Sequence, residues 1–277
     1  TKPYLAIEGA ETSCSVAVYR NACSPLLQLS YDQPRGHAEM LPQMVEGVLH
    51  WAGIDPAVLA GLAVSIGPGA FTGLRISVAL AQGLAYGWGV PVVAVSTLAA
   101  SAFSVLSMDS VLNTPTATGV HQAVQQAQSV LVALDARMGE LYCGLYTLSP
   151  AVELDLGRVT LLPQMPEAVM RPDALLDKPL VEFHADQHAN QTVSSLILTG
   201  SGFLGAERDV LGQLGHAWGI STRFRSSSLN ALSVLGVVLT QPQLAKVTDP
   251  ASLELVYLRH AVAVPPKRMN TETRPIS

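Results

Sequence analysis

Hydrophobic and polar residues alternate in short blocks through the first hundred residues, and the blocks predict strands and helices in mixed order. Apolar runs at residues 4–7, 14–19 and 26–31, separated by polar turns, are typical of strands. Residues 37–51 instead repeat apolar side chains every three or four positions, which predicts a helix with one buried face. Pro42 is compatible with this helix only if it lies in the first turn.

The next blocks continue the mixed order. Residues 59–66 predict a strand, which leads through a glycine-rich turn into a helix from about residue 74 to residue 86. Residues 90–95 predict a buried strand, and Ser96 can cap a helix over residues 97–106. Because the helix over 74–86 is apolar nearly all round, we expect the sheet to cover one side and the preceding helix or another subunit to cover the other.

The second half of the chain repeats the pattern of the first. Residues 132–135 and 141–146 match residues 5–8 and 14–19 at one constant offset: a strand ending in a carboxylate, a short turn, and a returning strand ending in tyrosine. A strand, a Gly-x-Gly turn and a helical stretch then recur at residues 198–214. Two matches in the same order indicate an internal duplication.

A duplicated α/β lobe with acidic hairpin turns and glycine-rich strand–helix turns is typical of the actin, sugar-kinase and Hsp70 class. We therefore predict a two-lobed actin-like (ribonuclease H-like) α/β duplication, with mixed sheets and flanking helices. Periodicity alone leaves a doubly wound sheet open. The predicted parts are a first lobe at 1–106, an insertion or connection at 107–128, a second lobe with the C-terminal helix at 129–264, and a disordered tail at 265–277.

Three segments of the second half have weaker patterns. Residues 108–128 are rich in Asn, Thr, Gln, Ser and Ala with little apolar periodicity, which favours an irregular insertion. Residues 150–190 are rich in proline and irregular, and we expect them to cap the second lobe. A last helix is predicted over residues 229–239, followed by a strand-like run over 253–258.

Composition narrows the class of protein. With 277 residues, 49% of them apolar and 13% charged, the chain can bury a large core. Mean hydropathy is high at +0.33, but no apolar run reaches the ~18 residues of a membrane helix, and no signal peptide is evident at the N-terminus, so we expect a cytoplasmic protein. Cys14, Cys23 and Cys143 are too scattered for a disulfide framework or a zinc site.

Charge bears on nucleic-acid binding. The net charge is −5, and the 16 Lys and Arg residues form no basic stripe of the kind that grips phosphates. If RNA is involved, we expect a partner to supply most of the phosphate contacts.

The glycine-rich turn is the most informative segment for chemistry. Gly67, Gly69 and Gly73 permit sharp turns, Thr72 can cap the following helix, and successive backbone N–H groups could form a nest for phosphate. The alternative is that glycines only let a strand enter a tightly packed helix. The segment has neither the Gly-Lys-Ser/Thr end of a P-loop nor the spacing of a dinucleotide fingerprint.

Other candidate groups are weaker. Glu8 and Asp135 could hold a magnesium ion together through water, but capping of their own hairpin turns is the favoured interpretation. His184 and His188 have the spacing of two metal ligands, without a third ligand in view. No Ser/His/Asp set or Cys/His pair can be assembled. We therefore predict no catalytic residue and no metal site.

Several segments together resemble one family. They are 65–84 with the letters GPGAFTGLR, 90–98, 5–7 with 13–18, 37–42, 133–142, 199–202 and 256–259. In this order they resemble the TsaB (YeaZ) family, bacterial tRNA threonylcarbamoyladenosine biosynthesis subunits of the TsaD/Kae-type actin-like class. Three places depart from the family pattern: Glu8-Gly9 replaces the usual Asp-Thr, Ala99 stands where an acid often follows the start of a helix, and residues 108–128 are longer than usual. Residues 96–100 also lack the HxxxH metal motif that TsaD relatives carry at the matching place.

The resemblance implies a non-catalytic scaffold. It implies a heterodimer with TsaD, activation of TsaD for threonylcarbamoylation of the adenosine 3′ of the anticodon, TsaE as a further partner, tRNA contact only through the complex, and a homodimer when alone. The isolated chain would hold no cofactor, although ATP or ADP could lie at the partner interface. The alternative is an active actin-like enzyme, an ATP-dependent kinase or a glycoprotease-type metallopeptidase.

The resemblance further implies pairing through first-lobe helices. The residues expected at that interface are His37, Leu41, Met44, Val45, Val48, Arg75, Val78, Leu80, Ala81 and Leu84.

Overall fold

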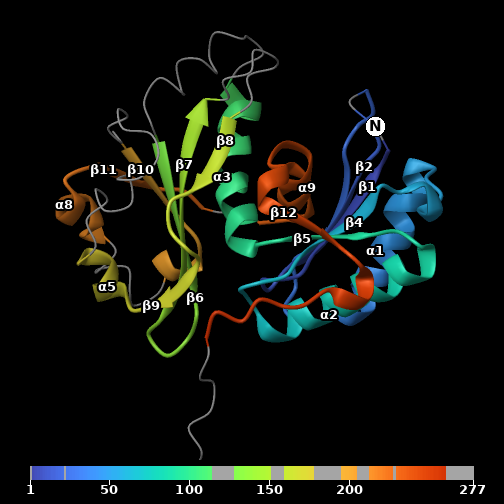
Figure 1. Ribbon diagram of the computed structural model, residues 1–277, viewed down its shortest axis with the longest axis horizontal. Helices are drawn as coiled ribbons and strands as arrows, with labels where there is room; N and C mark the ends of the chain where they lie inside the picture. The colour runs from blue at the N-terminus through green and yellow to red at the C-terminus, as the bar shows by residue number, and fades with distance from the viewer. Residues whose placement is uncertain are drawn as a thin grey trace, which may run out of the picture.

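Two lobes lie side by side, each built on a mixed β-sheet, with helices between the sheets (Figure 1). The computed structural model describes residues 2–21, 23–113, 128–150, 159–177, 195–204, 212–226 and 229–259.

The first sheet has six strands. Their order is β12 (Ala245–Thr248), β5 (Val92–Val95), β4 (Gly61–Ser65), β1 (Tyr4–Glu8), β2 (Cys14–Tyr19) and β3 (Leu27–Tyr31). Strands β5, β4 and β1 are parallel, whereas β2, β3 and β12 run antiparallel to their neighbours. The predicted strands near residues 4–31, 59–66 and 90–95 are confirmed within a few residues.

The second sheet repeats this topology. Its order is β11 (Ser221–Phe224), β10 (Ser195–Thr199), β6 (Gln128–Asp135), β7 (Leu141–Pro150) and β8 (Val159–Pro163), with β9 (Ala168–Met170) also paired to β7. Parallel β11, β10 and β6 correspond to β5, β4 and β1, and the antiparallel β7 and β8 correspond to β2 and β3. The repeated order and directions confirm the predicted actin-like duplication.

The longer helices form layers on these sheets. Helices α1 (His37–Ala52) and α2 (Phe71–Trp88) pack on one face of the first sheet, and α9 (Ala231–Thr240) packs on its other face. Helix α3 (Thr97–Asn113) lies between α9 and the second sheet, and its N-terminus is capped as expected, since Ser96 Oγ accepts from Leu98 N at 3.1 Å. The short helices α5 (Pro172–Leu176) and α8 (Leu214–Trp218) contact each other beside the second core.

Single-turn 3₁₀ helices complete the described residues. They are η1 (Pro56–Val58), η2 (Ser201–Phe203), η3 (Pro242–Leu244) and η4 (Pro250–Ser252).

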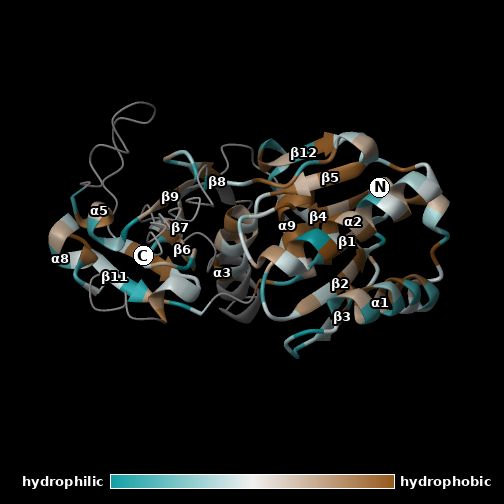
Figure 2. Cartoon of the chain, turned by 90° about the horizontal axis from the view of Figure 1, so that it is seen from below, coloured by the Kyte–Doolittle hydropathy of each residue, from teal (hydrophilic) through white to brown (hydrophobic). Residues whose placement is uncertain are grey.

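Residue size explains how three layers fit in the first lobe. Successive strand residues point to opposite faces, so Leu5 and Ile7 of β1 enter the core under α1 and α2, whereas Ala6 faces α9. The small side chains of Ala17 and Ala63, on the two neighbouring strands, lie with Ala6 in the middle of this face, which lets α9 approach closely. The most hydrophobic residues of this lobe are concentrated on the central strands of the sheet (Figure 2).

Some expectations for the C-terminal part are wrong. The last helix, expected within the second lobe, is α9 and contacts β1, β2, β4 and β5 of the first sheet. Strand β12 was not foreseen, and it pairs with β5. Residues 253–258 form no strand, because Val256 N–H makes a single ladder-like bond, to Ile66 O at 2.9 Å.

Three further expectations need correction. Residues 108–113 continue α3, so the expected insertion begins later, and residues 114–127 lie outside the described part. The proline-rich stretch 150–190 contains β8, β9 and α5 in its described part. Pro42 lies in the second turn of α1 rather than the first, on the exposed face of the helix, where the Ala38 carbonyl loses its helical donor outside the core. The predicted disordered tail 265–277 lies outside the described residues.

Among the helices that the structure describes, none is long and apolar enough to span a bilayer.

Candidate functional site

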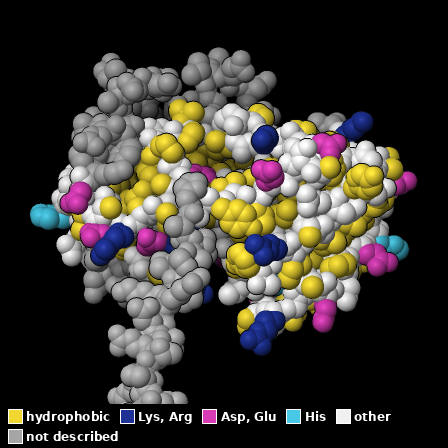
Figure 3. Space-filling model, turned by 60° about the horizontal axis from the view of Figure 1, so that its bottom comes forward, with side chains coloured by type: hydrophobic (Ala, Val, Ile, Leu, Met, Phe, Trp, Pro, Cys, Tyr) yellow, Lys and Arg dark blue, Asp and Glu magenta, His cyan; other side chains and the backbone are white. Residues whose placement is uncertain are grey.

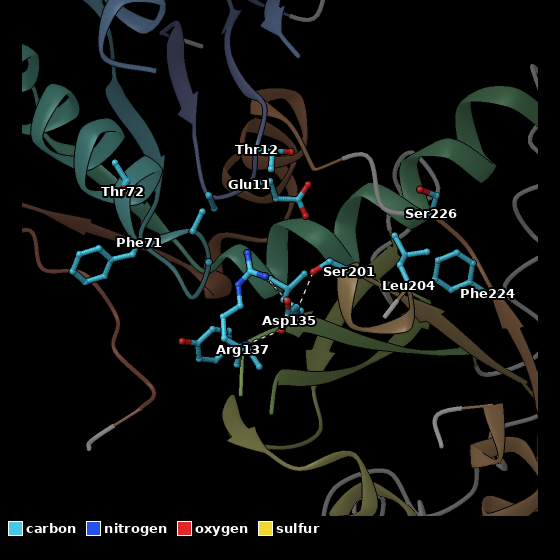
Figure 4. A pocket seen from close by; sticks show the side chains of 17 residues that line it. Glu11, Thr12, Phe71, Thr72, Asp135, Arg137, Ser201, Leu204, Phe224 and Ser226 are labelled. Atoms are coloured by element: carbon cyan, nitrogen blue, oxygen red, sulfur yellow. Dashed lines mark hydrogen bonds and ion pairs between the residues drawn. The ribbon is translucent and has the colours of Figure 1, made fainter. Parts of the chain in front are cut away.

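A cleft of about 690 Å³ lies where the turns of both lobes meet. Four turns line it: β1–β2 and β4–α2 from the first lobe, and β6–β7 and β10–η2 from the second. The lining residues are Ala10, Glu11, Thr12, Gly69, Ala70, Phe71, Thr72, Leu134, Asp135, Ala136, Arg137, Tyr142, Gly200, Ser201, Leu204, Phe224 and Ser226. Glu11 and Thr12 face Asp135, Arg137 and Ser201 across the opening (Figure 4). The duplicated turns therefore converge on one space.

The two first-lobe turns pack directly on each other. Ala70 N–H donates to Ala10 O at 2.6 Å. A Cβ added at Gly69 would lie 2.6 Å from Ala10 O, and one at Gly73 would lie 2.2 Å from Gly9 O. Because real Cβ atoms do not approach backbone oxygen so closely, both glycines are required for this backbone contact.

The residues predicted to form a phosphate nest separate into two groups. Gly69 and Thr72 line the cleft, whereas Gly73 is buried against the β1–β2 turn. Gly67 has φ 107° and packs against Val256 O, where a Cβ would lie 3.0 Å away. Thr72 does not cap α2, because the N-cap position is Ala70 and no side chain caps it. Phosphate binding by this turn stays a prediction.

Glu8 is turned away from the cleft. It is 2% exposed, and its carboxylate accepts from Ala10 N and from Ser65 Oγ. Burial raises the pKa of Glu8 to about 7, and the negative charge of nearby Glu11 adds to the rise. The hairpin-capping interpretation of Glu8 is confirmed.

Asp135 also caps its own turn, but it lines the cleft. Its Oδ1 accepts from Arg137 N at 2.7 Å, and its Oδ2 lies 3.3 Å from Arg137 Nη1. Its own N–H donates to Ser201 Oγ at 3.0 Å, which ties the β6–β7 turn to the β10–η2 turn. Glu8 and Asp135 are equivalent in the duplication, yet only Asp135 is presented to the cleft.

The β6–β7 turn is held by a residue that sequence reasoning did not single out. Arg137, Met138 and Gly139 all have positive φ, at 65°, 58° and 71°. Arg259 Nη2 donates to Ala136 O at 3.1 Å and to Arg137 O at 3.3 Å, and it also pairs with the Glu140 carboxylate. The only sequence signal was the place of Arg259 at the end of the family-like segment 256–259.

A second polar contact joins the lobes near the start of α3. Glu167 Oε1 accepts from Ser96 Oγ at 2.5 Å and from Tyr146 OH at 2.6 Å. Burial and the charge of Glu167 raise the pKa of the Tyr146 phenol well above its usual value. The Ser96 hydroxyl therefore serves both as the cap of α3 and as a link to the second lobe.

Most residues predicted for a partner interface lie inside the first lobe. His37, Leu41, Met44, Val45, Val48, Val78 and Ala81 are buried. Leu80 and Leu84 are half-buried against the core, and Arg75 is exposed. Of the predicted set, only these last three reach the surface, because the apolar faces of α1 and α2 turn toward their own sheet.

An apolar surface nevertheless remains along α2. Phe71 is 59% exposed, Tyr86 79% and Tyr257 52%. Arg75 lies 3.7 Å from the Phe71 ring centroid and donates to Tyr257 OH at 3.2 Å. Hydrophobic side chains gather on the face of the first lobe that comes forward in Figure 3.

The part of the chain that the structure describes contains no cluster of three or more His, Cys, Asp or Glu side chains suited to a metal ion. His184 and His188, which have the spacing of two ligands, lie outside the described residues.

Comparisons with known proteins agree on one family. The model of the TsaD family, described as tRNA N6-adenosine threonylcarbamoyltransferase, matches residues 32–214, more than half of the chain. The Escherichia coli K12 tRNA threonylcarbamoyladenosine biosynthesis protein TsaB is 35% identical over 143 residues, which is 51% of this chain and 54% of that protein. The Erythrobacter litoralis tRNA N6-adenosine threonylcarbamoyltransferase is 33% identical over 136 residues, 43% and 40% of the two chains.

A solved structure extends the likeness to nearly the whole fold. A Pseudomonas aeruginosa protein described as similar to the peptidase YeaZ has a TM-score of 0.65 and 26% identity, over 94% of this chain and 100% of that one. By sequence, this chain spans about half the length of the curated relatives it matches.

Proposed function

From the premise that the chain belongs to the TsaD family of actin-like proteins, with TsaB (YeaZ) proteins among its relatives, we infer that it takes part in tRNA threonylcarbamoyladenosine biosynthesis. Its role there is that of a partner subunit, which binds TsaD and supports the transfer of the threonylcarbamoyl group by TsaD. The name of the E. coli relative supports the pathway.

The exposed face of α2 is the observation that carries the partner role. Along this helix Arg75, Ala79, Gly83 and Tyr86 are exposed, one turn apart. Small residues in the middle of the row let another helix approach closely, and Tyr86, with 79% of its surface exposed, is a large aromatic group of the kind that anchors interfaces. Half-buried Leu80 adds to the apolar area beside the row.

The orientation of Glu8 favours a partner role over catalysis in the first-lobe half of the cleft. Its carboxylate is bound by Ser65 and Ala10 inside the lobe. Of the equivalent residues Glu8 and Asp135, only Asp135 could therefore offer its carboxylate to a metal-bound phosphate in the cleft.

The substitution Gly83→Arg tests the surface without harming the fold. A Cβ at Gly83 meets nothing within 4 Å, and Arg is a better helix former than Gly by about 0.8 kcal/mol. We expect an equal or higher melting temperature for the variant alone, and at least ~100-fold weaker binding to purified TsaD, because an unpaired charge in an interface costs several kcal/mol.

Ala217→Arg is the matched control. It adds the same charge at an exposed position of α8, in the other lobe, and should leave binding unchanged. Unchanged TsaD binding by Gly83→Arg would show that α2 is not the docking surface. Absence of any complex between the unmodified chain and TsaD at micromolar concentration, by size-exclusion chromatography, would refute the partner role.

An active actin-like enzyme is the alternative. The inter-lobe cleft and the likeness to a transferase favour it. In the partner role, ATP or ADP binds only when the complex has formed. Titration calorimetry with ATP–Mg²⁺ separates the two functions, since binding by the isolated chain together with turnover would establish the enzyme.

A further inference from the structure

Residues 250–259 connect α2 with the second lobe. Gln82 Nε2 of α2 donates to Pro250 O at 3.0 Å and to Leu253 O at 3.1 Å. Val256 N–H then bonds Ile66 O beside β4, and Tyr257 OH accepts from Arg75 of α2. The segment runs along α2 and then crosses toward the second lobe (Figure 1). Its first part is therefore fastened to the first lobe at three places.

The far end of this segment is fastened to the second lobe by Arg259. One nitrogen of its guanidinium contacts Ala136 O, Arg137 O and the carboxylate of Glu140, all within the β6–β7 turn. Nη2 carries two N–H groups, which these three acceptors share, and Nη1 adds a contact to Met138 Sδ at 3.6 Å. The Arg259 side chain is 18% exposed, so solvent screens the ion pair only in part.

The turn that Arg259 grips is conformationally costly. Arg137 and Met138 are non-glycine residues in the left-handed region, which costs about 1 kcal/mol or more for each unless the surroundings impose it. Two backbone hydrogen bonds close the turn: Ala136 N–H donates to Glu140 O at 3.0 Å, and Glu140 N–H donates to Arg137 O at 3.1 Å. Exchange of these two amide hydrogens therefore reports whether the turn is intact. Asp135 and Arg137, the residues on either side of Ala136, line the cleft.

We propose that residues 250–259 act as a strap that couples the exposed face of α2 to the β6–β7 turn in the cleft, with Arg259 as the positioning residue. A change at α2 shifts the strap through Gln82 and Tyr257, and Arg259 transmits the shift to the turn that carries Arg137. Whatever docks on α2 would thereby alter the cleft. The strap is a property of the chain alone and does not depend on the proposed function.

Hydrogen exchange measured on the full chain tests the contact between Arg259 and the β6–β7 turn. Arg259→Gln should speed exchange of the Ala136 and Glu140 amides about tenfold, because charged hydrogen bonds to the turn are lost. Arg259→Lys, which keeps the charge but loses the planar guanidinium and the Nη1 contact to Met138, should give an intermediate increase. The control is Arg171→Gln, which breaks an exposed pair with Asp173 in the same lobe. Unchanged exchange in both Arg259 variants overturns the proposal.

The coupling itself is tested from α2. Gln82→Met removes both bonds to the strap while keeping the length of the side chain, and it changes nothing in the second lobe. We expect exchange of the Ala136 and Glu140 amides to rise at least threefold, with near-native exchange elsewhere in β6 and β7. A rise confined to α2 and residues 250–257 overturns the coupling, even if Arg259→Gln behaves as expected. If Arg259→Gln fails to fold, Arg259→Lys and Gln82→Met decide the question.

Discussion

The buried carboxyl of Glu8 makes the stability of the first lobe depend on pH, and Glu8→Gln should remove that dependence. In the native chain this carboxyl is 2% exposed, and its pKa is raised from 4.5 to about 7, chiefly by burial. A shift of this size corresponds to roughly 3 kcal/mol between the protonated and ionised forms. Gln can keep both contacts, accepting from Ala10 N–H and donating to Ser65 Oγ.

The sign follows from proton linkage. Between pH 4.5 and about 7 the native state holds a proton that the unfolded state has lost. The stability contributed by protonated Glu8 is therefore complete below pH 4.5, falls as pH rises, and is gone above about pH 7. Glu8→Gln lacks this loss, so we expect the variant to gain stability relative to the parent chain as pH rises, by up to roughly 3 kcal/mol.

Thermal unfolding at pH 5 and pH 8, followed by circular dichroism, measures the effect. For a chain of this size ~3 kcal/mol corresponds to about 6–12 °C in melting temperature. Glu46→Gln, at an exposed position of α1, is the control and should show no such gain. If the melting temperatures of Glu8→Gln and the parent chain differ by the same amount at both pH values, the assigned burial of an ionisable Glu8 is wrong.

Two further predictions concern glycines and thiols. Gly73→Ala should destabilise the protein by about 3 kcal/mol, because its Cβ would meet Gly9 O at 2.2 Å. Gly83→Ala in the same helix should instead stabilise it by about 1 kcal/mol, since its Cβ meets nothing within 4 Å. Denaturant unfolding measures both changes in stability, and equal effects would contradict the packing of the β4–α2 turn on the β1–β2 turn. Burial raises the pKa of Cys14 to about 11 and of Cys143 to about 12, so iodoacetamide at pH 8 should label only exposed Cys23 in the native chain. Mass spectrometry that found rapid labelling of Cys143 would disagree with its position in the second core.

The strands and their duplication were predictable because each strand carries its own pattern. Residues 5–8 and 132–135 show the same apolar run ending in a carboxylate, and both became central strands with capping acids. The cap at Ser96 was equally local, since it needs only the residues that follow it. Local signals of this kind survive folding because the contacts they imply lie within a few residues.

Long-range placement was not predictable in the same way. The apolar sequence of α9 indicates that the helix is buried but does not say against which sheet. The small size of Ala6 and Ala17 is explained only once α9 is seen to pack over them. The apolar character nearly all round α2 likewise indicates that two sides of the helix are covered, but it does not identify which elements cover them. Val78 and Ala81 were therefore expected at a partner surface, whereas they lie in the core. Arg259 contacts a turn more than a hundred residues away, and its place in the family-like segment 256–259 did not indicate which turn that would be.

The position of α9 and β12 has a consequence for how the chain is made. The ribosome delivers the N-terminal strands early, but the side of the first sheet formed by Ala6, Ala17 and Ala63 has no cover until residues 231–248 have emerged. A nascent chain that ends after α3 would expose this side and the edge of β5 to solvent and to other chains. The two lobes therefore cannot mature strictly one after the other, because completion of the first must wait until all the strands of the second have been synthesised.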